Sequence, residues 1–183
     1  ALNTTQVAAL TTTQVGALTA TQVGGLESTD VAALTTTQIG ALTSTQLDAF
    51  STTQVRGLET TDLAVLTTTQ LRALDASLIG ALTTTQTEAL TTTQVGSLTS
   101  TQLGGLSSTQ VSALTTTQLG ALASSQVAAL TTAQLRGFDT TDIVALTTTQ
   151  VAGLGSTQIA GLTTTQVVAF ETTDLATLST TQL

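Results

Sequence analysis

An eight-residue period runs through the whole chain and constrains its fold more than any other feature. Residues 2–9 read LNTTQVAA, residues 10–17 read LTTTQVGA and residues 18–25 read LTATQVGG. The pattern continues without insertion or deletion, so that residues 2–177 make 22 repeats of eight, followed by a partial repeat over 178–183. A fixed period without a linker is typical of elongated repeat proteins. We therefore expect one continuous array over residues 1–183.

The positions of the octad, numbered 1 to 8 from its leucine, tolerate few residue types. Position 1 is Leu or Phe, position 4 is nearly always Thr, and position 8 is usually Ala or Gly. Position 6 is Val, Ile or Leu within the octads, except at Thr87. Position 5 is Gln except at five places, which are Asp30, Asp62, Leu78, Asp142 and Asp174.

Neither a continuous helix nor a plain strand fits this period. Eight residues advance an α-helix by about 800°, so an apolar stripe would rotate roughly 80° per octad and no face would stay apolar. Positions 1 and 6 have opposite parity, so a strand would send them to opposite faces. A β-solenoid or cross-β assembly, favoured by the low charge and the absence of Pro, remains the alternative to a helical array.

One short helix per octad satisfies three rules at once. Position 2 is commonly Ser, Thr, Asp or Asn, which are the preferred N-cap residues. Gln at position 5 has the spacing of a capping box, and positions 1 and 6 have the spacing of a hydrophobic staple. The sequence predicts a helix over positions 3 to 8 of each octad.

Helices this short are unstable alone, so we expect an all-α solenoid in which stacking holds them. Positions 1 and 6 should form its core, with Leu78 and Thr87 as local defects, and small residues at position 8 should allow close backbone approach or a positive φ. Acids at position 2 fall in even octads, and the three Arg, at position 7, fall in odd ones. This alternation predicts two octads, hence roughly 16 residues, in each coil of the solenoid.

The composition excludes several kinds of chemistry. The chain has no Cys, His, Met, Trp, Tyr, Pro or Lys, so no serine or threonine has a His or Lys base and we expect no enzyme activity, catalytic residue or cofactor. The net charge of -8 argues against nucleic acid partners. Thr and Gln interrupt every apolar run, which argues against membrane insertion.

Two sets of charged residues remain. Acid pairs three residues apart, such as Glu27 with Asp30, could hold Ca²⁺, but each offers few ligands, and acids at a helix start are favoured by the helix dipole alone. We therefore expect no metal site. Each Arg precedes an acid by three residues, as Arg56 precedes Glu59, and we expect an exposed pair there.

The LTTTQVxA octad resembles repeat tracts of long bacterial surface or secreted proteins described as adhesion-like. That resemblance implies an extracellular or cell-surface location and a non-enzymatic role as a stalk or spacer. Its partners would be flanking domains or further repeats, with self-association possible. The chain begins at Ala1 and stops within a repeat, as expected of a segment of something longer. The alternative is a Thr-rich ice-binding or ice-nucleation-like protein, because Thr recurs regularly along the array.

Overall fold

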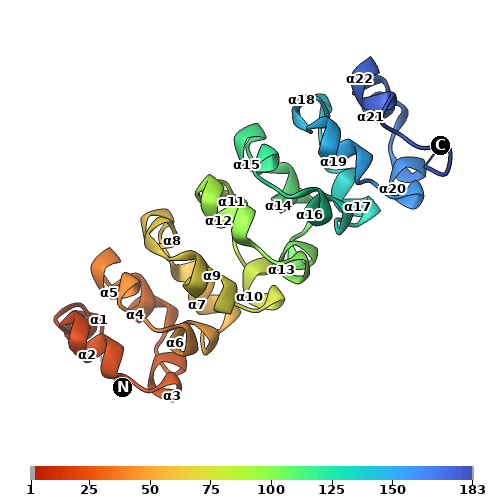
Figure 1. The fold of residues 1–183 in the computed structure, drawn as a ribbon. Helices are drawn as coiled ribbons and strands as arrows, with labels where there is room; N and C mark the ends of the chain where they lie inside the picture. Colours follow the sequence, from red (N-terminus) through yellow and green to blue (C-terminus); the bar gives the residue numbers. More distant parts are fainter. Residues whose placement is uncertain (1–2, 183) are drawn as a thin grey trace.

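The computed structural model describes residues 3–182 as a rod of short helices, one in each full octad (Figure 1). Leu2 and Leu183, which begin and end the repeat array, lie outside the described residues. No strand occurs in the described part of the chain. The helical solenoid is therefore confirmed and the β-solenoid alternative is wrong. The helices are α1 (Thr4–Ala8), α2 (Thr12–Ala17), α3 (Ala20–Gly24), α4 (Ser28–Ala32), α5 (Thr36–Gly40), α6 (Ser44–Asp48), α7 (Thr52–Gly57), α8 (Thr60–Val65), α9 (Thr68–Ala73), α10 (Ala76–Gly80), α11 (Thr84–Glu88), α12 (Thr92–Ser97), α13 (Ser100–Gly105), α14 (Ser108–Ser112), α15 (Thr116–Gly120), α16 (Ser124–Ala128), α17 (Thr132–Leu135), α18 (Thr140–Ala145), α19 (Thr148–Ala152), α20 (Ser156–Gly161), α21 (Thr164–Ala169) and α22 (Thr172–Leu175).

The capping box forms at the start of most helices as the sequence predicts. In α19 the backbone N–H of Gln150 donates to Thr147 Oγ1 (3.3 Å), and Gln150 Oε1 accepts from the backbone N–H of Thr147 (2.8 Å). The N-cap residue has an extended backbone, with φ -73° and ψ 154° at Thr147. Leucine and N-cap therefore act as the connection between successive helices, and each helix has only one or two turns.

The core is a single apolar column along the axis of the rod. Side chains at position 6 are fully buried from Val7 to Val151, and position 1 is buried through the middle of the array. Thr87 is buried in this column too, and its hydroxyl donates to the carbonyl of Thr83 at 2.9 Å. Leu78 is 5% exposed and joins the same core. The core assignment is thus confirmed, and the hydroxyl of Thr87 is satisfied within its own helix.

The coil contains more octads than the alternation of charges indicates. Contacts between helices join each helix to the third one along, as in α4 with α7 and α10 with α13. Hydrogen bonds between coils join residues 28 to 31 apart. In Figure 1, α3, α6, α10 and α13 follow one another along the lower side of the rod, in steps of three and four octads. A coil therefore has about 28 residues, or 3.5 octads (28/8), and the expectation of two octads per coil is wrong.

A physical reason for the larger coil lies in the connections. Two helices per coil would require the chain to reverse at every octad, through connections at the lower limit of the about 2–5 residues that helix reversals normally use. Here the connection consists of little more than the extended positions 1 and 2, as at Leu18 and Thr19. With 3.5 octads per coil, each connection turns the chain by about a quarter of a circle instead of half. The alternation of charges that predicted two octads per coil involves only a few acids and three Arg, too few to define the period of the coil.

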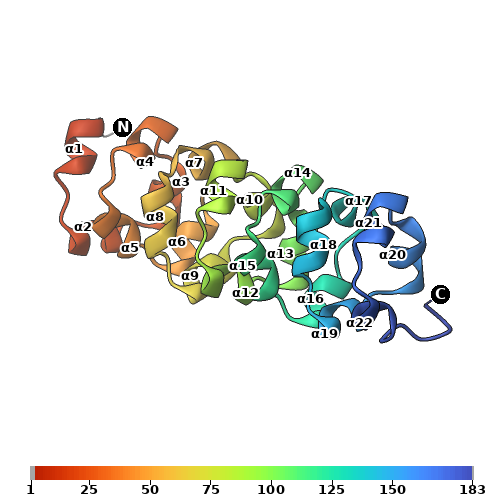
Figure 2. The same ribbon diagram turned by 90° about the horizontal axis from the view of Figure 1, so that it is seen from above.

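Successive coils stack along the rod, and α1 and α22 lie at its opposite ends (Figure 2). Glycine is required where two coils approach most closely. A Cβ on Gly105 would overlap the carbonyl oxygen of Ala76, one coil earlier, whereas a Cβ on Gly104 would have no atom within 4 Å. None of the described residues has a positive φ. Close approach, and not left-handed backbone, is therefore the reason for glycine at the tight corners.

Gly105→Ala should destabilise the array, and Gly104→Ala should not. The first change forces the backbones of α10 and α13 apart, at a cost of about 1–3 kcal/mol. The second replaces a solvent-facing helical glycine and should stabilise by about 0.5–1 kcal/mol. Urea unfolding followed by circular dichroism measures both. Equal effects of the two substitutions would contradict the proposed close approach.

Candidate functional site

The most elaborate arrangement of polar side chains lies between the coils and is formed by the glutamines at position 5. Gln150 is 2% exposed. Its Oε1 caps its own helix, while its Nε2 donates to the carbonyl oxygens of Leu119 (2.8 Å) and Leu122 (2.7 Å) in the preceding coil. Each such amide satisfies a helix start and, one coil earlier, a helix end. We call the glutamines that do this the Gln ladder; they are Gln38, Gln46, Gln54, Gln70, Gln86, Gln94, Gln102, Gln110, Gln118, Gln126, Gln134, Gln150, Gln158, Gln166 and Gln182.

The spacing of positions 2 and 5 predicts the capping half of this arrangement but not the bonds between coils. A capping box accepts Glu as readily as Gln, yet position 5 is never Glu in this chain. A carboxylate could cap the helix but could not donate to the two carbonyls below it. The absence of Glu was the signal available in the sequence.

The first coil has the capping box without the ladder. Gln14 accepts from the backbone N–H of Thr11 at 2.8 Å and is exposed, because no preceding coil lies within the described residues to receive its amide. Gln6 and Gln22 are exposed in the same way. In Gln6, Gln14 and Gln22 the side-chain oxygen caps the helix, while the side-chain nitrogen has no preceding coil to bond among the described residues.

Four aspartates stand at position 5 in place of glutamine, and an ionised carboxylate has no donor for the carbonyls of the preceding coil. Asp142 is 7% exposed, and its Oδ2 accepts from the backbone N–H of Asp139 at 3.0 Å. Burial raises the pKa of Asp142, and the neighbouring carboxylate of Asp139 raises it further, against a backbone hydrogen bond that lowers it. Burial likewise raises the pKa of Asp62, while hydrogen bonds from the Glu59 backbone and the Thr36 hydroxyl lower it.

The acid pairs therefore serve as modified capping boxes. In the pair of Glu27 and Asp30, the aspartate accepts from the backbone N–H of the glutamate at 3.1 Å, and the glutamate side chain makes no cap hydrogen bond. Among residues 3–182, no group of three or more Asp and Glu side chains is placed to hold a metal ion. Our expectation that these pairs bind no metal remains a prediction.

Arginine makes a different contact from the one expected. Arg56 Nε donates to the carbonyl oxygen of Ala81 (3.0 Å), and Arg136 Nε donates to that of Gly161 (2.6 Å). Both acceptors lie 25 residues further on, in the next coil. These two guanidinium groups thus cap helix ends across coils, where we had expected a pairing with the acid three residues along.

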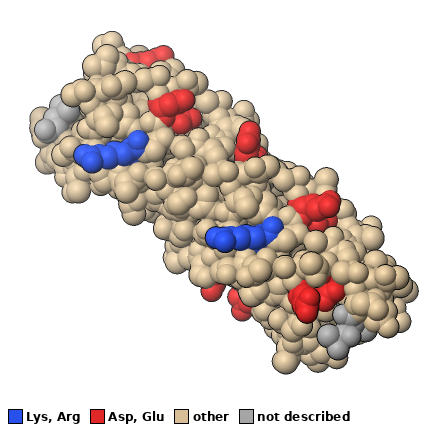
Figure 3. All heavy atoms as spheres, turned by 180° about the vertical axis from the view of Figure 1, so that it is seen from behind, with Lys and Arg blue, Asp and Glu red and all other residues tan. Residues whose placement is uncertain are grey.

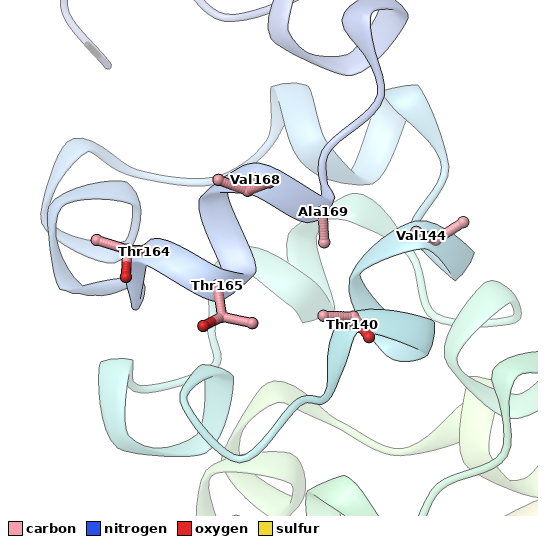
Figure 4. Close-up of a pocket in the computed structure, with 6 residues that line it drawn as sticks. All are labelled: Thr140, Val144, Thr164, Thr165, Val168 and Ala169. Carbon is pink, nitrogen blue, oxygen red and sulfur yellow. The ribbon is translucent and has the colours of Figure 1, made fainter.

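The outer surface carries few charges and has a shallow hollow near its C-terminal end. Figure 3 shows acidic and basic side chains scattered singly over a mostly uncharged face. An open hollow of about 530 Å³ lies between α18 and α21 and is lined by Thr140, Val144, Thr164, Thr165, Val168 and Ala169. In Figure 4, Thr165 and Ala169 point toward the segment that carries Thr140, and Val168 is 84% exposed. The lining has no titratable side chain to act as acid, base or nucleophile.

The fold and the Gln ladder define a helical tandem-repeat solenoid. The chain belongs to the ALTTAQ repeat family, whose model matches residues 1–28, 23–60, 55–92, 88–116, 95–132 and 135–170. Comparison with curated proteins gives no match. Among the described residues, no helix has the length and apolar character needed to cross a bilayer.

Gln150→Glu should destabilise the array at pH 7, whereas Gln14→Glu should change stability by less than about 0.5 kcal/mol. Both variants keep the capping acceptor and gain the same favourable charge at a helix start. Only the Gln150 variant would bury a carboxylate against two carbonyl oxygens that lose their donor, at a cost of about 1–3 kcal/mol or more. Thermal unfolding of both variants measures the difference. Equal melting temperatures would show that the amide bonds between coils contribute nothing.

Asp142→Gln should stabilise the array at pH 7 by about 0.5–1.5 kcal/mol, because the longer amide can reach Val111 and Leu114 in the preceding coil. The raised pKa of Asp142 means that its contribution to stability is present at low pH and lost as pH rises through the folded pKa, above 3.8. The advantage of the variant should therefore shrink as pH falls toward 4. Urea unfolding at a series of pH values measures it.

Asp142→Asn serves as the control for this experiment, since it removes the charge without lengthening the side chain. It should abolish the pH dependence that comes from this site and give a smaller stabilisation than Gln. An advantage of the Gln variant that grows on acidification would contradict the assignment of Asp142.

Proposed function

We propose that this chain is a non-enzymatic structural spacer that extends other domains of an extracellular or cell-surface protein. The observation that carries the proposal is the regular bonding between coils. Every ladder amide bonds two or three of the same three carbonyl positions, 28 to 31 residues earlier, as Gln54 does with Val23 and Leu26. Length can therefore be added in octads without a new kind of interface.

The surface supports the same proposal. A rod that recognised one ligand would be expected to concentrate charged, aromatic or chemically reactive side chains at one place. Here the charges are scattered, and the three aromatic residues Phe50, Phe138 and Phe170 are buried in the core. The proposed partners are flanking domains or further repeats of the same protein.

Ice binding is the alternative, and exposed threonines are the feature that favours it. Thr116 and Thr117, at positions 3 and 4, are exposed, in contrast to buried Gln118. The adjacent Thr115 uses its hydroxyl as an N-cap for α15. Thermal hysteresis with faceted ice crystals would support this alternative over a spacer.

The spacer proposal predicts that function depends on the length of the array and not on its surface. Residues 98–153 make a whole number of octads and span two coils. In the cells that encode the protein, their deletion should shorten the reach, which is the distance from the cell surface to the domain that the rod carries. Substitution of exposed Thr116 and Thr117 by Ser in the full-length array should leave that reach unchanged. Atomic force or electron microscopy of the surface layer measures the reach.

Labelling of intact cells with an antibody to the array tests the location separately. We expect labelling without permeabilisation. Labelling only after permeabilisation would refute a surface role, and equal reach in the deletion variant would refute the spacer role.

A further inference from the structure

The ladder has gaps, and each leaves a main-chain carbonyl without a donor. At Asp62, Leu78, Asp142 and Asp174, the position-1 carbonyl that a ladder amide would bond, one coil earlier, has no hydrogen-bond donor among the described residues. These carbonyls belong to Leu34, Phe50, Leu114 and Leu146, below Asp62, Leu78, Asp142 and Asp174 respectively. All four residues are buried, with exposures of 3–5%. A buried carbonyl without a donor destabilises the interface that contains it.

The gaps are unevenly spaced, and two of them fall in one interface. We call a plane between two successive helices in the interior of the rod a cut. Each ladder bond joins residues nearly four octads apart, so four successive position-5 residues are placed to bond across each cut. Between α12 and α13 these residues are Gln102, Gln110, Gln118 and Gln126, and all four bond across the cut.

Between α6 and α7 the same four places are taken by Gln54, Asp62, Gln70 and Leu78. Only the two glutamines bond across this cut. The neighbouring cut between α7 and α8 also has two ladder bonds, made by Gln70 and Gln86. From α4 to α20, each of the other cuts lacks at most one of its four amide links.

We propose that the interface around α7 is a built-in joint, at which the rod opens before any other interior interface. We call the joint residues 50–65, from Phe50 to the end of α8. Helix packing across this region, of α4 on α7 and of α6 on α9, remains in place. Two further polar contacts also cross it and limit the opening without replacing the ladder. The Thr36 hydroxyl lies close enough to Asp62 to hydrogen-bond its carboxylate. Arg56 bonds the carbonyl of Ala81 across the cut between α7 and α8 but not across the cut between α6 and α7.

The joint gives the rod a defined point of local unfolding, whether or not it acts as a spacer. In a solenoid, each repeat is held mainly by its nearest neighbours. The loss of two of the four links across one cut is therefore not compensated by distant coils. Local unfolding follows the weakest cooperative unit. The inference rests on the hydrogen bonds between coils and does not require the proposed function.

Native-state hydrogen exchange of the full chain tests the joint. The lowest interior protection should lie in α6 to α8, on the order of ten-fold or more below α11 to α14, as expected for loss of one or two hydrogen bonds. The double variant Asp62→Gln with Leu78→Gln should raise protection at the joint by about ten- to a hundred-fold and leave α14 to α17 unchanged.

A matched transplant of the gaps provides the control. Gln94→Asp with Gln110→Leu leaves only Gln86 and Gln102 bonding across the cut between α10 and α11, and it should create a second weak interface there. Uniform interior protection, a minimum elsewhere, or a minimum unmoved by either double variant would overturn the proposal. If the variant with Asp62→Gln and Leu78→Gln does not fold, the variant with Gln94→Asp and Gln110→Leu decides alone. Its substitutions fall in an interface that has all four ladder bonds in the parent chain.

Discussion

The side-chain amide of glutamine is the interaction on which this fold depends. A helix of five or six residues leaves most of its backbone donors and acceptors without partners inside the helix. Gln150 meets this deficit from both directions, since its oxygen accepts from the start of α19 and its nitrogen donates to the end of a helix in the preceding coil. Burial of the apolar column then adds stability to helices that are too short to persist alone.

The exceptions to the repeat are informative because the rule is so regular. Asp142 preserves the cap and loses the bond between coils, Leu78 loses both in exchange for apolar burial, and Gln14 preserves the cap with no preceding coil to bond. These residues separate the two roles of position 5. They also change the number of hydrogen bonds between coils from place to place while the backbone trace stays nearly uniform.

Local structure could be predicted from this sequence far better than the arrangement of coils. The Thr–Gln spacing and the Leu–Val spacing identify the helix start and the core, because both are relations within one octad. The number of octads per coil is a relation between octads, and near-identical repeats carry little information about which of them meet. Charges such as Arg56 gave a misleading period, since its guanidinium bonds the carbonyl of Ala81 across coils instead of the nearby acid. The missing Glu at position 5 was the one clue to the bonds between coils.

A coil of about 3.5 octads has a consequence for how such arrays lengthen and shorten. Duplication or loss of one octad keeps the amide bonds in register, because every octad offers the same donors and acceptors. It also rotates everything beyond that point by roughly a quarter of a circle about the rod axis. Only when the octads gained or lost add up to two whole coils does a surface feature return to the same side. Slippage between repeats in the gene would therefore change the direction in which an attached domain faces before it appreciably changed the distance at which that domain is held.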